Sequence, residues 1–241
     1  MIITGATNGI GLAAAKALVA LGASLAIVAR SEERARAAVA EIERGGGDRT
    51  RVDILLADLS SQAEIRRLAA EIEDRYPKID VLINNAGAIN TRLQLTVDGI
   101  ELTWAVNHLA PFLLTTLLLD RLKSSAPSRV VTTSSDAHFG ATIPFDEFHD
   151  ERAYRGFRRY GQSKLANILF TVELARRLSG SGVTANCFHP GLVVTGFNRN
   201  NGPMMNVAMS LIQPFSRRPK KGSETLIWLA ASPEAAAVTG G

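Results

Sequence analysis

The sequence predicts a single α/β domain in which a doubly wound parallel sheet is covered by helices on both faces. Short apolar or β-branched runs alternate with amphipathic stretches of helical period along the whole chain, as expected for successive strand–helix–strand units. A chain of 241 residues is long enough for one sizeable core and stays below the size at which cores usually divide. Hydrophobic residues make up 46% of it and charged residues 21%, the composition of an ordinary globular protein. We therefore expect one domain over residues 1–241.

The alternation resolves into strands and helices in turn. Strands are expected at residues 1–4, 24–29, 51–56, 81–84, 129–133 and 183–188, and helices at residues 9–21, 31–44, 61–76, 96–123, 157–179 and 222–231. Ser31 is a suitable N-cap, and Ser61 with Glu64 three residues later forms a capping box. Two longer loops, at about 136–156 and 196–221, follow strands of the sheet. Because ligands bind at the carboxyl ends of parallel strands, these two loops are predicted to form the walls of a substrate site.

Charge and composition exclude several classes of protein. The formal net charge of +4 is spread over many Arg and Lys residues, without the basic run and interleaved aromatic residues of a nucleic-acid surface. Contact with a phosphate or an acidic lipid is an alternative role for the densest basic stretches, 155–159 and 217–221. The four histidines show no zinc-site spacing, so no metal is expected. A lone cysteine, Cys187, excludes an internal disulfide and fits a reducing compartment. The chain opens without a leader pattern, and its longest apolar run, 109–119, is too short to span a bilayer. We therefore expect a cytoplasmic protein without a membrane span.

A glycine-rich turn follows the first expected strand and opens the first expected helix. Its glycines stand where the chain must turn tightly and approach a pyrophosphate, and the helix N-terminus offers backbone N–H groups to the phosphates. This is the arrangement of a dinucleotide-binding Rossmann fold. A glycine turn alone is a weak signal, and the spacing here is wider than GxGxxG. The residues expected to contact the dinucleotide are Gly5, Thr7, Asn8, Gly9, Ile10 and Gly11.

The end of the second expected strand favours NADP(H) over NAD(H). An NAD-specific site would place a carboxylate there to accept hydrogen bonds from the ribose 2′-hydroxyl, but the chain has Arg30. The planar guanidinium can pair with a 2′-phosphate, although a solvent-facing arginine is the alternative. Asp58 and Leu59 close the third strand, where they could meet the adenine or serve only as a loop and cap.

A tyrosine and a lysine four residues apart supply the candidate chemistry. Tyr160 and Lys164 project from one face of an expected helix. A neighbouring ammonium stabilises phenolate and lowers the tyrosine pKa from about 10, as a general acid/base near neutral pH requires. Such a pair is common by itself on surface helices. Ser134 and Ser135 end a strand, so one hydroxyl would lie at the carboxyl edge of the sheet, and strand alternation allows only one of them to face the site.

Taken together, these motifs resemble the short-chain dehydrogenase/reductase family over nearly the whole chain. The resemblance lies in the glycine turn, Asn84-Asn85-Ala86-Gly87, Ser135, the tyrosine–lysine pair and Pro190-Gly191, in the family's order. It implies a catalytic tetrad of Asn107, Ser135, Tyr160 and Lys164. Tyr160 would protonate the carbonyl oxygen, Ser135 would steady it, Lys164 would contact the nicotinamide ribose and Asn107 would order a water. The further cofactor contacts that it implies are Asn85, Ala86 and Gly87 at the adenosine ribose, and Pro190, Gly191, Val193 and Thr195 near the nicotinamide.

Within that family the chain resembles the retinol dehydrogenase and WW-domain oxidoreductase branch. The segments 107–112, 134–138 and 163–167 carry this likeness, as does the long interval between Ser135 and Tyr160. Substrates there are often hydrophobic aldehydes, ketones and alcohols. Apolar side chains of the two loops could wall such a pocket or form plain local core; these are Phe139, Ile143, Phe145, Phe148, Met204, Met205 and Met209. Relatives also suggest a homo-oligomer formed through the helices at 96–123 and 157–179.

Three functions remain to be separated. The first is an active NADP(H)-dependent oxidoreductase acting on a small carbonyl or alcohol. The second is a dinucleotide-sensing or scaffold protein that keeps the fold without turnover, against which the complete tetrad argues. The third is a Rossmann methyltransferase, which would need the glycine turn but not the pairing of Tyr160 with Lys164.

Overall fold

The computed structural model describes residues 1–145, 154–191, 193 and 217–241, and its centre is a fully parallel sheet. The sheet has six strands in the order β3-β2-β1-β4-β5-β6. Their bounds are β1 Ile2–Thr4, β2 Leu25–Ala29, β3 Val52–Leu56, β4 Val81–Asn84, β5 Ser128–Thr133 and β6 Val183–Phe188. The chain winds outward in both directions from the β1–β4 neighbours. This is the doubly wound Rossmann order, in which the crevice for a ligand lies where the winding reverses.

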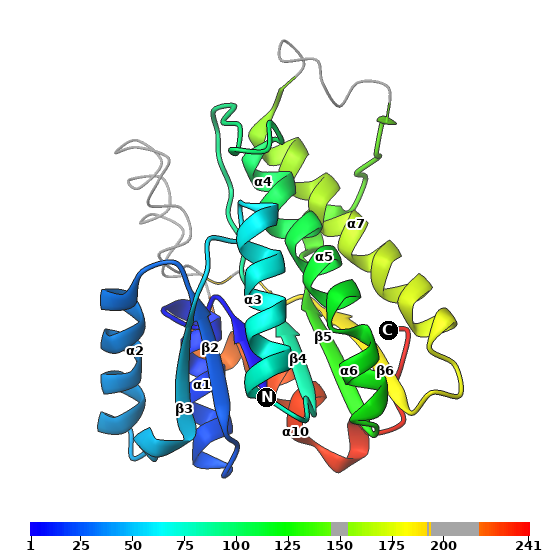
Figure 1. Cartoon of the computed structure of the whole chain (residues 1–241). Coiled ribbons are helices and arrows are strands. Elements are labelled where there is room, and N and C mark those ends of the chain that lie inside the picture. The colour runs from blue at the N-terminus through cyan, green and yellow to red at the C-terminus, as the bar shows by residue number, and fades with distance from the viewer. Residues whose placement is uncertain (146–153, 192, 194–216) are drawn as a thin grey trace.

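Helices cover both faces of the sheet, and each face has its own apolar layer. One layer holds Ile3 and Leu18, both fully buried, and the other holds Leu68 and Leu114. Figure 1 shows α3, α5 and α6 in front of the sheet, with α1 and α10 behind it. The helices of the first layer are α1 Gly9–Ala20, α2 Glu32–Arg44 and α10 Glu224–Ala231; those of the second are α3 Gln62–Arg75, α5 Ala110–Leu117, α6 Leu119–Ser124 and α7 Gly156–Arg177.

The predicted fold class and strands are confirmed. Every strand matches its expected bounds to within one residue. Strands β1, β2 and β4 are buried on both faces and are nearly continuous apolar runs, which are easily located. The two predicted serine caps are also present. Ser31 Oγ accepts from the Arg34 amide at 3.3 Å, and Ser61 Oγ accepts from the Glu64 amide at 3.4 Å.

The helix predicted at 96–123 is wrong over its first six residues. Residues 96–101 form a turn in which the Gly99 amide donates to the Thr96 carbonyl at 3.0 Å, and Gly99 has a φ of +72°. The helix begins after Glu101, whose carboxylate accepts from the amides of Thr103 and Trp104 at 2.9 and 2.8 Å. It then runs as α4 Leu102–Trp104, a π-helical turn Ala105–Leu109, α5 and α6. The helix predicted at 222–231 is present as α10, which begins two residues later, and a short helix, α9 Pro219–Gly222, precedes it.

Residues 146–153 of the first predicted substrate loop, and residues 194–216 before and within the second, lie outside the described part of the chain. Phe148, Thr195, Met204, Met205 and Met209 lie there. In the parts that are described, no helix is long and apolar enough to cross a membrane.

Candidate functional site

The glycine turn forms a tight cradle between β1 and β4. Gly5 and Gly9 adopt left-handed conformations, with φ of +69° and +54°. A Cβ on Gly5 would stand 2.7 Å from the Ala86 Cα, and one on Gly11 would meet the Gly5 carbonyl oxygen. Only glycine fits at these contacts, so the turn can pack tightly against the loop after β4 where α1 begins. The N-terminus of α1 therefore presents N–H groups at the expected phosphate position.

Thr4 and Asn85 hold this turn against the end of β4. Thr4 Oγ1 accepts from the amides of both Asn85 and Ala86 at 3.0 Å. Asn85 Nδ2 donates in turn to the carbonyls of Thr4 and Gly5, each at 3.1 Å. The Asn85 side chain thus positions the turn, while Ala86 and Gly87 remain partly exposed at the crevice.

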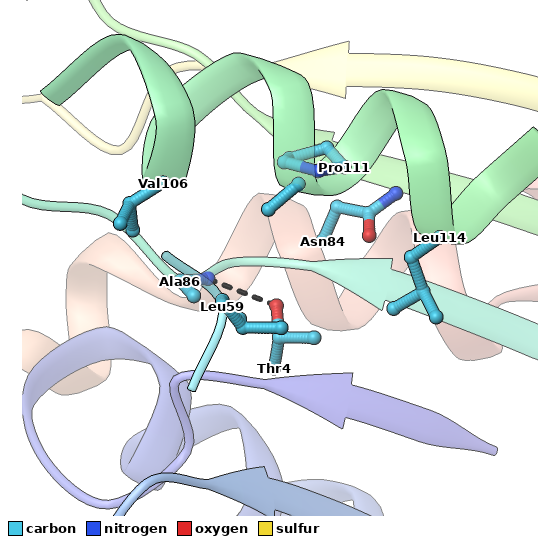
Figure 2. Close-up of a pocket in the computed structure, with 8 residues that line it drawn as sticks. Thr4, Leu59, Asn84, Ala86, Val106, Pro111 and Leu114 are labelled. Atoms are coloured by element: carbon cyan, nitrogen blue, oxygen red, sulfur yellow. Dashed lines mark hydrogen bonds between the residues drawn. The ribbon is translucent and has the colours of Figure 1, made fainter. Parts of the chain in front are cut away.

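A small pocket lies beside the cradle, too narrow in this structure to hold a water molecule. In Figure 2, Leu59 and Ala86 from the loops after β3 and β4 lie opposite Val106 and Pro111 on the helical segment. Asn84 Oδ1 lies in the lining and has no hydrogen-bond partner among the described residues. The full lining is Thr4, Leu59, Asn84, Ala86, Val106, Ala110, Pro111 and Leu114.

The adenosine end of the crevice carries Arg30 and Asp58. Arg30 is exposed directly after β2, ahead of the Ser31 cap. Asp58 Oδ1 accepts from the Ser60 amide at 2.9 Å and from the Ser60 hydroxyl at 2.8 Å, so the cap role weighed for it is present. Leu59 lies at the pocket instead.

Tyr160, Ser135 and Lys164 converge at the carboxyl end of β5. The Tyr160 phenol hydrogen-bonds the Ser135 side chain. Lys164 Nζ lies 5.5 Å from the centroid of the Tyr160 ring and donates to the Thr133 carbonyl at 2.9 Å. Ser134 turns the other way, and its Oγ donates to the Lys164 carbonyl at 2.9 Å. Ser135 is therefore the serine that faces the tyrosine, which settles the choice that strand alternation left open.

Burial, rather than the lysine charge, dominates the electrostatics of this group. Burial raises the pKa of the Tyr160 phenol, and the bond with Ser135 only partly offsets it. Burial also lowers the pKa of Lys164 to about 8. The expectation that the lysine lowers the tyrosine pKa below 10 is thus wrong for this structure. A dry site penalises both charged forms, and Nζ donates to the Thr133 backbone carbonyl.

Asn107 lies behind the tyrosine, in the π-helical turn, and is fully buried. Its Oδ1 accepts from the Ala88 amide at 2.7 Å, and its Nδ2 donates to the Ala88 carbonyl at 2.9 Å and to Ser163 Oγ at 3.1 Å. Ser163 Oγ in turn donates to the Tyr160 carbonyl at 2.7 Å. The side chain of Asn107 therefore joins the loop after β4 to the helix of Tyr160.

The segment after β6 reaches over the glycine turn. A Cβ on Gly222 would stand 2.6 Å from Val193 Cγ2, 3.5 Å from Ile10 Cγ1 and 3.5 Å from the Pro190 carbonyl oxygen. Gly191 has a φ of +76°. Pro190, Gly191 and Val193 are thus brought beside the start of α1, and Thr195 lies outside the described residues.

Sequence reasoning missed three contributors to this site. Thr4 anchors the turn, Thr133 supplies the carbonyl that holds the lysine, and Asn167 bonds to Asn107. The position of Thr4 before the glycine turn was a usable signal. The other two act through contacts that only the packing of α7 on β5 creates.

Comparison with known proteins agrees with this geometry. A family model for short chain dehydrogenases matches residues 1–206. Mouse retinol dehydrogenase 14 is 40% identical over 255 residues, covering 100% of this chain and 75% of that protein. Human retinol dehydrogenase 12 is 42% identical over 226 residues, covering 93% and 71%.

Solved structures show the same fold. RhlG of Pseudomonas aeruginosa in complex with NADP has a TM-score of 0.78 at 29% identity, covering 99% of this chain and 91% of that one. A short chain dehydrogenase from Burkholderia cenocepacia in complex with NADP has a TM-score of 0.76 at 30% identity, covering 99% and 92%. These matches exclude the methyltransferase alternative, and this chain belongs to the short-chain dehydrogenase/reductase family of enzymes, in its retinol dehydrogenase-like branch.

Proposed function

We propose that this enzyme interconverts a carbonyl and an alcohol on a small hydrophobic substrate with NADP(H), and that Tyr160 is its general acid/base. The observation that carries the proposal is the convergence of the Tyr160 phenol, the Ser135 hydroxyl and the Lys164 ammonium beside the glycine cradle. Family membership supports carbonyl–alcohol interconversion. We infer the choice of cofactor and the substrate class from the residues described below.

The cradle supports a dinucleotide site, because the glycine turn places the N-terminus of α1, with its free N–H groups, directly after β1 at the carboxyl edge of the sheet. Asn8, Gly9 and Ile10 would offer backbone N–H groups to the phosphates, with Gly5, Thr7 and Gly11 shaping the turn. Leu59 after β3 and Ala86 after β4 would contact the adenosine part of the cofactor at this edge of the sheet. The remaining contacts proposed for the cofactor are Arg30, Asp58, Asn85, Gly87, Pro190, Gly191, Val193 and Thr195.

When bound, the reduced nicotinamide supplies the hydride that forms the new C–H bond. Ser135 holds the substrate oxygen by a hydrogen bond, and Tyr160 donates its phenol proton to that oxygen as the carbonyl becomes an alcohol. The Lys164 ammonium stabilises the resulting phenolate. Asn107 keeps the tyrosine helix in place through Ser163.

NADP(H) preference rests on Arg30. This side chain is exposed at the end of β2, where a carboxylate would select NAD(H). Two solved relatives hold NADP. A guanidinium pairs with a phosphate through two parallel hydrogen bonds, so Arg30 is the residue proposed to select the 2′-phosphate.

A hydrophobic substrate is supported by exposed aromatic rings near Tyr160. The turn at 137–141 packs on α7 beside Gly161, whose Cβ would meet the Ala137 carbonyl. Phe139 in this turn is 74% exposed and Phe145 after it is 79% exposed, so neither belongs to local core. The curated relatives are named retinol dehydrogenases, which agrees with an apolar substrate. The cytoplasmic location expected from the sequence stays a prediction, tested by fractionating cells that express the chain.

The test is turnover of hydrophobic aldehydes, ketones and secondary alcohols with each cofactor, followed by NADPH absorbance. Tyr160→Phe should lower kcat by about 10²–10⁴-fold while NADPH affinity is kept. Tyr76→Phe is the matched control, since Tyr76 bonds to Asp53 at the far edge of the sheet. Full activity of Tyr160→Phe would remove the tyrosine from the mechanism. NADPH binding by the unmodified chain without turnover of any substrate would favour the sensing or scaffold function instead.

A further inference from the structure

The helix that carries Asn107 is interrupted at this residue. Ala105–Leu109 form a π-helical turn, a feature that is frequent at functional sites. Pro111, four residues after Asn107, has no N–H to donate to the Asn107 carbonyl, as a regular α-helix would require. This carbonyl is therefore open to a donor from another element.

Asn167 on α7 supplies that donor. Its side chain is 1% exposed, and its Nδ2 donates to the Asn107 carbonyl at 2.8 Å. The same Nδ2 lies 3.4 Å from the Thr133 carbonyl, which accepts from Lys164 Nζ at 2.9 Å. Asn167 follows Lys164 by three residues, so both side chains project from one face of α7. One amide thus links the carbonyl that holds the lysine to the interrupted turn of Asn107.

His108 fixes the orientation of this amide. Its Nδ1 lies 3.1 Å from Asn167 Oδ1, and because an amide oxygen only accepts, Nδ1 carries the hydrogen of the bond. The imidazole packs against Trp104, with 4.9 Å between ring centroids. Burial lowers the pKa of His108, so the ring is neutral at neutral pH. If the amide rotated by 180°, its oxygen would face the Asn107 carbonyl and its NH₂ would face the His108 N–H.

We propose that Asn167 is a positioning residue for Lys164: its amide, oriented by His108, fixes the Thr133 carbonyl that holds the lysine ammonium and ties it to the turn of Asn107. This inference rests on the proposed function, because it places Asn167 behind the same proton transfer. Without the Asn167 Nδ2 donor, the Thr133 carbonyl and the Lys164 ammonium that it holds become more mobile, and water enters beside the Lys164 side chain. A displacement of about 1 Å in a reacting constellation can cost about 10²-fold in rate.

The principal test is Asn167→Leu, which removes both amide contacts at similar volume. We expect kcat for carbonyl reduction to fall about tenfold or more, while the Kd for NADPH, measured by fluorescence, changes less than about threefold. The pH profile separates positioning from mere stabilisation. Reduction needs the Lys164 ammonium, so activity declines as pH rises through the Lys164 pKa, which burial holds at about 8. Water entry raises this pKa, so the alkaline limb moves to higher pH in the variant. Tyr160 and His108 are the other titratable side chains that contact this network, and Asn167→Leu replaces neither of them.

Two further variants complete the test. Thr171→Val is the matched control, because Thr171 is 2% exposed and its Oγ1 donates to the Asn167 backbone carbonyl at 2.8 Å. It should keep both kcat and the alkaline limb. His108→Phe preserves the aromatic packing but frees the amide, so it should move the limb in the same direction with a smaller loss of kcat. It also decides the matter if Asn167→Leu does not fold.

Three results would overturn the inference. They are an unmoved alkaline limb in both Asn167→Leu and His108→Phe, an equal loss of kcat in Thr171→Val, or unchanged kcat in Asn167→Leu. Failure of the unmodified chain to reduce any carbonyl with either cofactor is a different result, since it overturns the proposed function itself and the inference with it.

Discussion

Replacing Lys164 by methionine should stabilise the fold while abolishing activity. The side chain is 2% exposed, and burial lowers its pKa from 10.5 to about 8. This difference of about 2.5 units corresponds to about 3 kcal/mol of unfavourable burial of the ammonium, at 1.36 kcal/mol per unit. Methionine has a similar length and no charge, but it loses the bond to the Thr133 carbonyl, which contributes about 1 kcal/mol. The expected net gain in the free energy of unfolding at pH 7 is about 2 kcal/mol.

The stability gained by Lys164→Met depends on pH. Between about pH 8 and 10.5 the unfolded chain holds the lysine proton more firmly than the folded chain, so wild-type stability rises with pH through this window. The advantage of Lys164→Met is therefore largest below pH 8 and shrinks toward pH 10.5. Urea denaturation at pH 7 and at pH 10 measures it, and the melting temperature at pH 7 should rise by roughly 4–8 °C.

Lys123→Met is the control, because Lys123 is exposed and its replacement should change stability by less than about 0.5 kcal/mol. A Lys164→Met variant that is less stable than wild type at pH 7 would refute the reasoning. So would a gain that does not diminish as pH rises.

The remaining predictions concern the cofactor, the serine pair and assembly. Arg30→Asp should shift the ratio of kcat/KM from NADP(H) toward NAD(H) by about tenfold or more, and an unchanged ratio would make Arg30 a surface residue only. Gly11→Ala places a Cβ 2.5 Å from Asn85 Nδ2, so NADPH affinity by fluorescence titration should fall at least about tenfold; normal affinity would refute the cradle. Ser135→Ala should lower kcat by about 10²-fold and leave the melting temperature nearly unchanged. Ser134→Ala should keep kcat but lower the free energy of unfolding by about 1 kcal/mol, because it loses the bond to the Lys164 carbonyl. The reverse pattern would exchange the roles of the two serines. Leu169 is 54% exposed on α7, the helix through which we expect a homo-oligomer to form. Leu169→Arg should therefore lower the molecular mass measured by light scattering. A wild-type protein that is already a monomer would contradict this prediction.

Strands β1, β2 and β4 were predictable because each is a nearly continuous apolar run closed by a polar or glycine residue. Strands β5 and β6 carry polar residues among β-branched and apolar ones. The error at 96–123 has a local cause. Thr96 Oγ1 accepts from the amides of Asp98 and Ile100 at 3.2 and 3.3 Å, which closes a turn that hydrophobic periodicity does not detect. The π-helical turn that follows was equally hidden, because Ala105, Val106 and Leu109 keep the helix apolar on both sides of Asn107 and His108. Pro111 was the only local sign that this helix is irregular.

The site divides in the same way between local signals and tertiary contacts. The glycine turn and the spacing of Tyr160 and Lys164 are local, so the sequence located both. The pKa argument failed because it considered the charge of Lys164 and not the burial of the two groups, which depends on how α7 packs on β5. The choice between Ser134 and Ser135 likewise depended on the Lys164 carbonyl, a partner thirty residues away.

The start of α7 shows how buried charge outside the reacting groups positions Tyr160. Arg159, the residue before it, faces inward with 8% exposure and lies 3.9 Å from the Glu101 carboxylate. Glu101 also caps the helix that leads to Asn107 and accepts from the Tyr154 hydroxyl at 3.1 Å. Rotation of α7 about its axis would separate Arg159 from Glu101 and leave buried charge uncompensated. The ion pair therefore resists this rotation. Glu101 therefore fixes the register of both helices that bring Asn107 and Tyr160 together, although it lies in a segment where the sequence predicted only the middle of a helix.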